Sequence, residues 1–327
     1  MKAIAIEGSG PAARLVTAHR PRPVPKADEV LIQVMAAGVN RPDLLQRQGL
    51  YPAPSGASDI PGLEVAGWVR QTGNEVTRLR PGDRVCALVN GGGYAEFVTA
   101  PKDQCFGLPD GLGFREAAGL PEALFTVFAN VFEMGRLIAG ETLLIQGGTS
   151  GIGHLAIQMA HQAGARIIAT ASTAKKLDAI DRLGATPVSY REAAFKDRLQ
   201  EAAGPGGIDV ILDMVGAPYL AMHLDLLNPG GRLLLIAGQG GFKSEINLRR
   251  ILTRRLTVTG STLRSRSPEF KAHLAQGLLQ RFWPRVETGD IKPLIHAVFP
   301  LEEAEQAQAF MASGQHIGKI ILEPDHG

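Results

Sequence analysis

The stretch Thr142–Gly153, TLLIQGGTSGIG, decides the fold of this chain of 327 residues. A short β-prone run leads directly into a glycine-rich turn, and apolar residues recur at helical spacing after the turn. Bare backbone amides at the start of a helix can approach a pyrophosphate, whose charge the helix dipole favours. The alternative is that the glycines only allow the chain to turn tightly and bind no cofactor. We predict a dinucleotide-binding unit, in which one helix face carries Ile152, Leu155, Ala156, Met159, Ala160 and Ala163.

The same rhythm of strand and helix continues on the C-terminal side of this stretch. Six strands separated by helical patterns predict a Rossmann-type, doubly wound, six-stranded parallel sheet. The expected strands are Thr142–Gln146, Arg166–Thr170, Thr186–Ser189, Ile208–Asp213, Arg232–Ala237 and Leu256–Gly260.

The residues on both sides of this region have a different pattern. Residues 1–118 alternate short β-prone runs with glycine turns, and residues 264–327 indicate two helices and a closing strand, Lys319–Leu322, that returns to the first domain. We therefore predict an α/β protein of two domains: a β-rich substrate domain formed by 1–118 and 264–327, and a cofactor domain formed by 119–263.

Composition limits the class of partner. Lys and Arg number 34 against 32 Asp and Glu, a formal net charge of +2, which gives no strong field for nucleic acid or anionic membranes. Two cysteines, Cys86 and Cys105, provide neither a disulfide framework nor a thiolate cluster for structural zinc. No apolar run reaches membrane-spanning length. We expect a cytoplasmic protein with a small-molecule substrate.

The end of the second expected strand indicates which cofactor is bound. An NAD site usually has an acid there to hold the ribose hydroxyls, but Ala169–Thr173 contains none. Lys175 and Lys176 follow, and a lysine beside a small hydroxyl residue suits a 2′-phosphate. We predict NADPH as the cofactor, with two solvated surface lysines as the alternative.

Several segments, in this order and spacing, identify a family. GVNRPDLLQRQGLYP (Gly38–Pro52), PGLEVAG (Pro61–Gly67), the glycine turn, LRSRSPEF (Leu263–Phe270) and IGKIIL (Ile317–Leu322) span nearly the whole chain. The chain resembles the zinc-free quinone oxidoreductase branch of the medium-chain dehydrogenase/reductase family, closest to the tumour-suppressor-inducible type. The resemblance implies a GroES-like substrate domain beside the Rossmann domain, and metal-free hydride transfer from NADPH to a quinone.

The resemblance also places the zinc ligands of the family's alcohol dehydrogenases. Asn40 stands where the cysteine would fall, and Leu63 takes the place of the histidine before Glu64. Too few donors remain for Zn²⁺, so we predict no metal. Ser150 departs from the usual glycine turn but matches the inducible type, and its hydroxyl either contacts the cofactor or only fits.

Residue roles carry over from the resemblance in two groups. Near the nicotinamide we expect catalytic Asn40, Tyr51 and Asp43, although Tyr51 could be a loop-packing aromatic and Asp43 a helix N-terminal carboxylate. Tyr190 beside the 2′-phosphate could equally be a packing anchor. The cofactor residues expected are Thr126, Gly147, Gly148, Ser150, Gly151, Ile152, Gly153, Thr173, Lys176, Tyr190, Gly238, Leu263 and Lys319.

Other functions fit part of the pattern. Short-chain dehydrogenases share a similar turn, but no tyrosine here has a lysine four residues later. A reductase of activated carbon–carbon double bonds in enones or alkenals needs the same hydride geometry and is the main alternative. A non-enzymatic, crystallin-like or RNA-binding protein is the alternative of another class, resting on the basic run Arg249–Arg255. The expected edge strand Leu256–Gly260 suggests a homodimer, or a tetramer.

Overall fold

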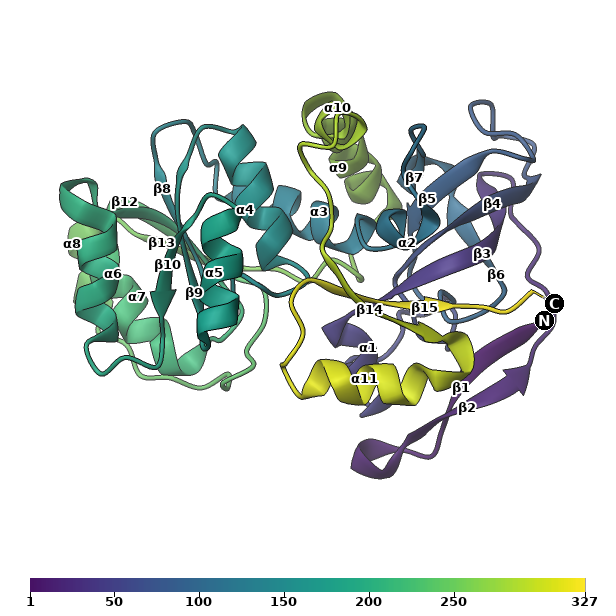
Figure 1. Cartoon of the computed structure of the whole chain (residues 1–327), viewed down its shortest axis with the longest axis horizontal. Helices are drawn as coiled ribbons and strands as arrows, with labels where there is room; N and C mark the ends of the chain where they lie inside the picture. The colour runs from purple at the N-terminus through teal and green to yellow at the C-terminus, as the bar shows by residue number, and fades with distance from the viewer. Residues whose placement is uncertain (327) are drawn as a thin grey trace. The chain divides into compact units, whose positions relative to one another are not determined.

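The computed structural model describes residues 1–326 and divides into two compact units (Figure 1). The β-rich unit comprises Met1–Phe125 and Arg264–Gly327, and the parallel-sheet unit comprises Thr126–Leu263. Among the described residues, no helix combines the length and apolarity needed to cross a bilayer.

The parallel-sheet unit contains six strands, all parallel, in the order β10-β9-β8-β11-β12-β13. The order reverses between β8 and β11, which is where doubly wound sheets bind ligands at their carboxyl edge. The predicted six-stranded sheet is confirmed. Its strands are β8 Thr142–Ile145, β9 Arg166–Ala171, β10 Thr186–Ser189, β11 Ile208–Asp213, β12 Leu227–Leu235 and β13 Thr257–Gly260.

The last two strands of this sheet can be compared with their predicted bounds and position. Strand β12 begins at Leu227 rather than Arg232, because Leu227 already pairs with Ile208 of β11, and the turn-like residues Asn228–Gly231 form a register shift before the pairing resumes at Arg232. Strand β13 lies at the sheet edge, as predicted, and pairs with β12 alone in this sheet. The homodimer that we inferred from this edge stays a prediction.

Helices cover both faces of the parallel sheet (Figure 1). The predicted apolar face of α4 is buried at Leu155, Ala156, Met159 and Ala160, but burial extends to eight of the ten helix residues, including polar His154 and Gln158. Those two side chains bond to the main chain at Ser150 O, 2.8 Å, and His154 O, 3.1 Å, which lets them be buried. The helices are α4 Gly153–Gln162, α5 Ala174–Arg182, α6 Phe195–Ala203, α7 Leu220–Leu226 and α8 Leu248–Arg254.

The β-rich unit is built on the eleven-residue strand β3, Glu29–Val39, which pairs with three other strands. Its seven-stranded sheet runs β14-β15-β3-β4-β5-β7, with β6 also on β3, and β1 and β2 form a separate hairpin. The other strands are β1 Lys2–Glu7, β2 Arg14–His19, β4 Glu64–Thr72, β5 Arg84–Leu88, β6 Phe97–Pro101, β7 Cys105–Gly107, β14 Ile295–Pro300 and β15 Lys319–Glu323.

Strand β15 pairs antiparallel with β3, so the C-terminal segment returns to the first domain as predicted. The expectation of only two helices and one strand after residue 264 was wrong. Strand β14 alternates half-buried and exposed residues without a strong apolar pattern, and α10 has only five residues. The helices of this region are α9 Pro268–Arg281, α10 Trp283–Glu287 and α11 Ala304–Ala312; earlier come α1 Arg41–Arg47, α2 Phe114–Ala117 and α3 Pro121–Val127.

Candidate functional site

The glycine turn joins β8 to α4 and is tied to the neighbouring strand β9. Gly147 adopts a φ of +76° and donates its N–H to Thr170 Oγ1 at 3.1 Å, while Gly148 N donates to Thr170 O at 2.9 Å. Ser150 Oγ accepts from Gly153 N at 2.9 Å. The Ser150 hydroxyl therefore caps the first turn of α4, and its own proton remains to be donated.

Close packing explains why the turn requires glycine. A Cβ on Gly153 would lie 2.2 Å from Gly147 O, and one on Gly148 would lie 2.6 Å from the Ala169 Cβ. The N–H groups of the first helical turn, from Gly151 and Ile152 onward, point out of the helix end with a partial positive charge. This arrangement fits a pyrophosphate, because the N–H donors and the positive end of the helix dipole meet at a turn whose glycines have no side chains.

The residues expected at the 2′-phosphate lie at the same edge of the parallel sheet. Thr173 is the N-cap residue of α5 and is exposed, and Lys176 follows in the first turn, where burial lowers its pKa. Tyr190 comes directly after β10, with its N–H bonded to Ala171 O at 3.1 Å and 41% of its surface exposed. The carboxyl ends of β9 and β10 thus bring these three side chains to one region.

The remaining predicted cofactor residues have different surroundings. Gly238 lies after β12, in a loop that bonds to the loop after β11 through Gln239 N and Met214 O at 3.1 Å. Leu263 is buried, and Thr126 O accepts from Asn130 Nδ2 at 2.8 Å. The other predicted cofactor residue, Lys319, lies in the β-rich unit, where it takes part in a buried ionic cluster.

A buried ionic cluster in the β-rich unit joins the end of β3, the start of β4 and the start of β15. Lys319 Nζ pairs with Glu64 Oε1 and donates to Asn40 Oδ1 at 2.8 Å. Asn40 Nδ2 donates to Glu64 Oε1 at 2.8 Å, so both ends of its amide are engaged. Lys319 is 1% exposed and Glu64 fully buried. Asn40 is therefore held rigidly by a charge pair that water does not reach.

Asp43 occupies the capping position that was the alternative to a catalytic role. It accepts from Asn40 N at 2.8 Å, Gly62 N at 3.2 Å and the Tyr94 hydroxyl at 2.9 Å. Burial raises its pKa from 3.8 to about 6, although these hydrogen bonds lower it. The carboxylate thus fixes the turn that carries Asn40 into α1.

Tyr51 belongs to a separate group of side chains. The Arg264 guanidinium lies 5.9 Å from its ring centroid and is anchored by Gln46 Oε1 at 2.8 Å and Asn90 O at 2.7 Å. Burial raises the pKa of Tyr51, as does the charge of Glu122. The Tyr51 phenol thus stays protonated, as a hydrogen-bond donor must.

Sequence reasoning missed the buried charges around the predicted residues. Lys319 was assigned to the cofactor, and Glu64, Glu122, Arg264 and Lys271 received no role. Their signal was a charged residue inside an apolar segment, as in LEVAG and GKIIL, because a buried charge needs a partner.

Glu122, at the start of α3, is a further buried carboxyl. Its N–H donates to Glu64 Oε2 at 2.9 Å, and its side chain is also influenced by Asp43, Lys319 and Lys271. Burial, and then the charge of Glu64, raise the pKa of Glu122 from 4.5 to about 8, against the lowering effect of Lys319. Glu122 therefore carries a proton at neutral pH.

We expect the Glu122→Gln variant to lose part of the pH dependence of stability. The folded chain keeps the Glu122 proton up to about pH 8, whereas the unfolded chain releases it near pH 4.5, so stability falls as pH rises between these values. One proton corresponds to about 1.4 kcal/mol per pH unit, so from pH 5 to 6.5 wild type should lose about 2 kcal/mol relative to the variant.

Urea unfolding at several pH values measures this difference. The exposed Glu75→Gln variant is the matched control and should follow wild type at each pH. Parallel pH profiles for wild type and Glu122→Gln would contradict a raised pKa at Glu122.

Comparisons with known proteins bear on both units. Two family models match: an alcohol dehydrogenase GroES-like domain over residues 26–110 and a zinc-binding dehydrogenase over residues 151–279. The quinone oxidoreductase of Rattus norvegicus is 33% identical over 326 residues, covering 98% of this chain and 97% of that protein. The chain belongs to the medium-chain dehydrogenase/reductase family. The resemblance to that family noted in the sequence is thus confirmed.

Two solved structures resemble this medium-chain dehydrogenase/reductase over nearly its whole length. Mycobacterial Rv1454c, complexed with NADPH, is 28% identical with a TM-score of 0.87 and covers 99% of this chain and 100% of that chain. CurK enoyl reductase is 26% identical with a TM-score of 0.85 and covers 99% of each chain. The protein is therefore an oxidoreductase of an NAD(P)-dependent family.

The zinc ligands of the medium-chain dehydrogenase/reductase family have no equivalent set around Asn40. Within residues 1–326, no group of three or more His, Cys, Asp or Glu side chains is arranged to hold a metal ion. Leu63 is a buried apolar residue, and the Lys319 ammonium places a positive charge beside Asn40 and Glu64. These residues do not fit a Zn²⁺ ion, which needs thiolate, imidazole or carboxylate donors free of another cation.

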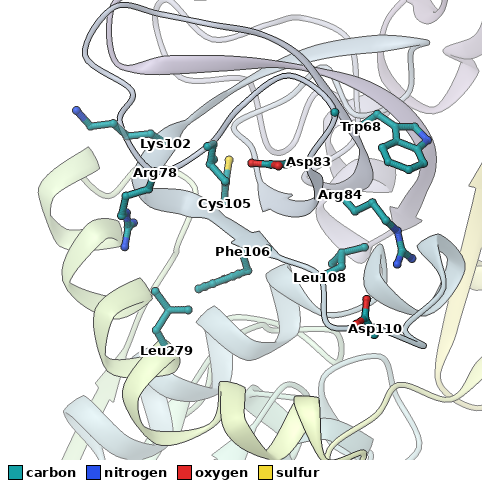
Figure 2. Close-up of a pocket in the computed structure, with 13 residues that line it drawn as sticks. Trp68, Arg78, Asp83, Arg84, Lys102, Cys105, Phe106, Leu108, Asp110 and Leu279 are labelled. Atoms are coloured by element: carbon teal, nitrogen blue, oxygen red, sulfur yellow. The ribbon is translucent and has the colours of Figure 1, made fainter.

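The β-rich unit of this medium-chain dehydrogenase/reductase also has a pocket of about 520 Å³, which Figure 2 shows. The pocket is lined in part by Arg78, Arg84, Lys102 and Cys105, and by none of the predicted site residues. Arg78 pairs with Asp103 at 3.8 Å, and Lys102 Nζ donates to Glu75 O at 2.9 Å. Because Arg78 and Lys102 are already engaged and none of the predicted site residues lines the pocket, we assign no role in catalysis to it.

Proposed function

We propose that the protein is an NADPH-dependent quinone reductase that works without a metal ion. The observation that carries the proposal is the cluster in which the Lys319 ammonium bridges Asn40 and Glu64. This charge pair leaves no donor set for zinc, and without a Lewis acid the reduction of simple ketones is disfavoured. A quinone accepts electrons readily, and the rat relative is named a quinone oxidoreductase.

The glycine turn and the ends of β9 and β10 would hold the cofactor. The first-turn amides of α4 and the Ser150 hydroxyl suit the pyrophosphate, and Thr173, Lys176 and Tyr190 suit the adenosine 2′-phosphate. When bound, NADPH supplies the hydride. The likeness to Rv1454c, which was solved with NADPH, supports this choice of cofactor.

We expect Lys176→Ala to reduce the preference for NADPH over NADH by about 10-fold, because it removes one charge-assisted contact to the 2′-phosphate. The ratio of kcat/KM for the two cofactors measures the preference. Lys175→Ala, on the exposed neighbouring residue, is the matched control and should keep the wild-type ratio. An unchanged ratio in Lys176→Ala would contradict the assignment.

Of the three predicted catalytic residues in the β-rich unit, we assign one to contact with the quinone and two to positioning roles. We propose that the Tyr51 hydroxyl donates to the quinone oxygen that gains charge, since its raised pKa keeps it protonated. Asn40 and Asp43 act as positioning residues, because their polar atoms are occupied by Lys319, Glu64, Gly62 and Tyr94.

A turnover panel with NADPH against a small quinone, an open-chain enone and a simple aldehyde tests the proposal, with zinc content measured on the same sample. Quinone turnover well above the other two, without stoichiometric zinc, is the expected result. Faster turnover of the aldehyde, or activity that chelators abolish, would contradict it.

Reduction of an activated carbon–carbon double bond is the second candidate. The likeness to CurK enoyl reductase favours it, and such a reaction needs the same hydride donor and likewise no metal. Faster turnover of the enone than of the quinone would select this function. A nucleic-acid-binding role is less well supported, because Arg250 pairs with Asp225 and Arg254 is bonded to Asp225 O and Leu227 O.

A further inference from the structure

A chain of fully buried polar side chains lies under the glycine turn of the parallel-sheet unit. Gly147 N donates to Thr170 Oγ1 at 3.1 Å, and Thr170 Oγ1 donates to Gln146 Oε1 at 2.7 Å. Gln146 Nε2 lies 2.9 Å from His223 Nε2, and His223 Nδ1 lies 3.2 Å from Asp213 Oδ2. Thr170, Gln146, His223 and Asp213 are all 0% exposed.

The hydrogen bonds along this chain indicate one arrangement of its protons. Thr170 accepts from Gly147, so its own proton goes to Gln146 Oε1. The amide of Gln146 then donates, and His223 Nε2 must accept. The ring proton is then on Nδ1, which lies 3.2 Å from Asp213 Oδ2 without the alignment of a hydrogen bond. The hydrogen bonds from Gly147 through Thr170 and Gln146 to His223 therefore run in a single direction.

The chain ends on a second loop at the carboxyl edge of the sheet. Asp213 Oδ1 accepts from Val215 N at 2.7 Å and Gly216 N at 3.1 Å, which folds the loop after β11. That loop in turn receives Gly240 N at Val215 O, 2.8 Å, from the loop after β12. The glycine turn is thereby linked through side chains to the loops after β11 and β12.

We propose that Thr170, Gln146, His223 and Asp213 are positioning residues that set the backbone of the glycine turn and the loop after β11 for nicotinamide cofactor binding. The inference rests on the proposed cofactor function of this unit. The chain holds the Gly147 N–H inward toward Thr170, so the donors left to face a pyrophosphate are those of the first turn of α4.

Two variants of one residue separate positioning from bulk stability. Thr170→Val keeps the shape of the side chain but removes the acceptor of Gly147 N–H and the donor to Gln146, whereas Thr170→Ser keeps both. We expect the NADPH Kd to rise about 10-fold in Thr170→Val and to stay within about twofold of wild type in Thr170→Ser. In turnover, the loss in Thr170→Val should appear as a higher KM for NADPH rather than as a lower kcat, because Thr170 supports the glycine turn.

The histidine provides an independent pair. His223→Gln can accept from Gln146 and donate to Asp213, while His223→Leu can do neither, so only the second should weaken NADPH binding. Direct binding is followed by NADPH fluorescence, and folding by urea unfolding of the same samples.

Equal Kd values for Thr170→Val and Thr170→Ser, or a loss of kcat at saturation without a change in Kd, would overturn the proposal. If wild type binds NADH but not NADPH and the contrast persists with NADH, the chain has its proposed role and only the cofactor preference fails. If wild type binds neither cofactor, both proposals fall.

Discussion

Replacing Lys319 with methionine should lower the free energy of unfolding of the β-rich unit by about 3–5 kcal/mol, the usual cost of removing one partner of a buried ion pair. Methionine fills nearly the same volume but leaves the Glu64 carboxylate buried without a cation, and leaves Asn40 Oδ1 without its donor. The loss comes from this uncompensated charge rather than from a cavity.

Tryptophan emission during urea unfolding measures this loss in the correct unit. The chain has two tryptophans, Trp68 and Trp283, and both lie in the β-rich unit. Lys2→Met is the matched control, because Lys2 pairs with Glu302 at 3.2 Å with 41% of its side chain exposed, and such exposed pairs add little to stability. A loss in Lys319→Met no larger than in the control would refute a stabilising role for the buried pair.

A double variant identifies the cause. Adding Glu64→Gln to Lys319→Met removes the stranded charge and should recover at least about 1 kcal/mol, giving a coupling energy between the two positions. If the double variant is as unstable as the sum of the two single variants, packing rather than charge explains the effect.

The parallel-sheet unit was predictable because its signals are local. Each strand is a short apolar run bounded by turn residues, and the glycine turn carries its own backbone requirement at Gly147, where φ is +76°. Even in this unit, the chain of buried polar side chains beneath the glycine turn was not predicted. Gln146 and Thr170 are ordinary strand-end residues in the sequence, and His223 is 77 positions from Gln146.

The ionic cluster of the β-rich unit was beyond local patterns. Asn40 and Lys319 are 279 positions apart and meet only because β15 pairs with β3. The sequence therefore placed Asn40 and Asp43 in one segment but not their partners, and it assigned Lys319 to the cofactor on the resemblance alone. Strand β14 was missed for a related reason, since a parallel partner strand, β15, supports it where its own pattern is weak.

The Gly153→Ala variant should bind NADPH about 100-fold more weakly than wild type, within the range that overpacking of 1–3 kcal/mol produces. The new Cβ would lie 2.2 Å from Gly147 O, a backbone atom that moves only if the turn opens. Opening the turn would also break the bonds of Gly147 and Gly148 to Thr170. The glycine turn of the proposed cofactor site would thus lose the bonds that hold it in place.

Helix propensity separates a specific effect of Gly153→Ala on the turn from a general loss of helix stability. Gly153 begins α4, where alanine is intrinsically favoured over glycine by about 1 kcal/mol, so a general weakening of the helix is not expected. Gly107→Ala, at a position with no heavy atom within 4 Å of the added Cβ, is the matched control and should bind NADPH as wild type does. Isothermal titration gives both Kd values. Tight binding by Gly153→Ala would mean that the close approach of Gly147 and Gly153 is not what shapes the cofactor site.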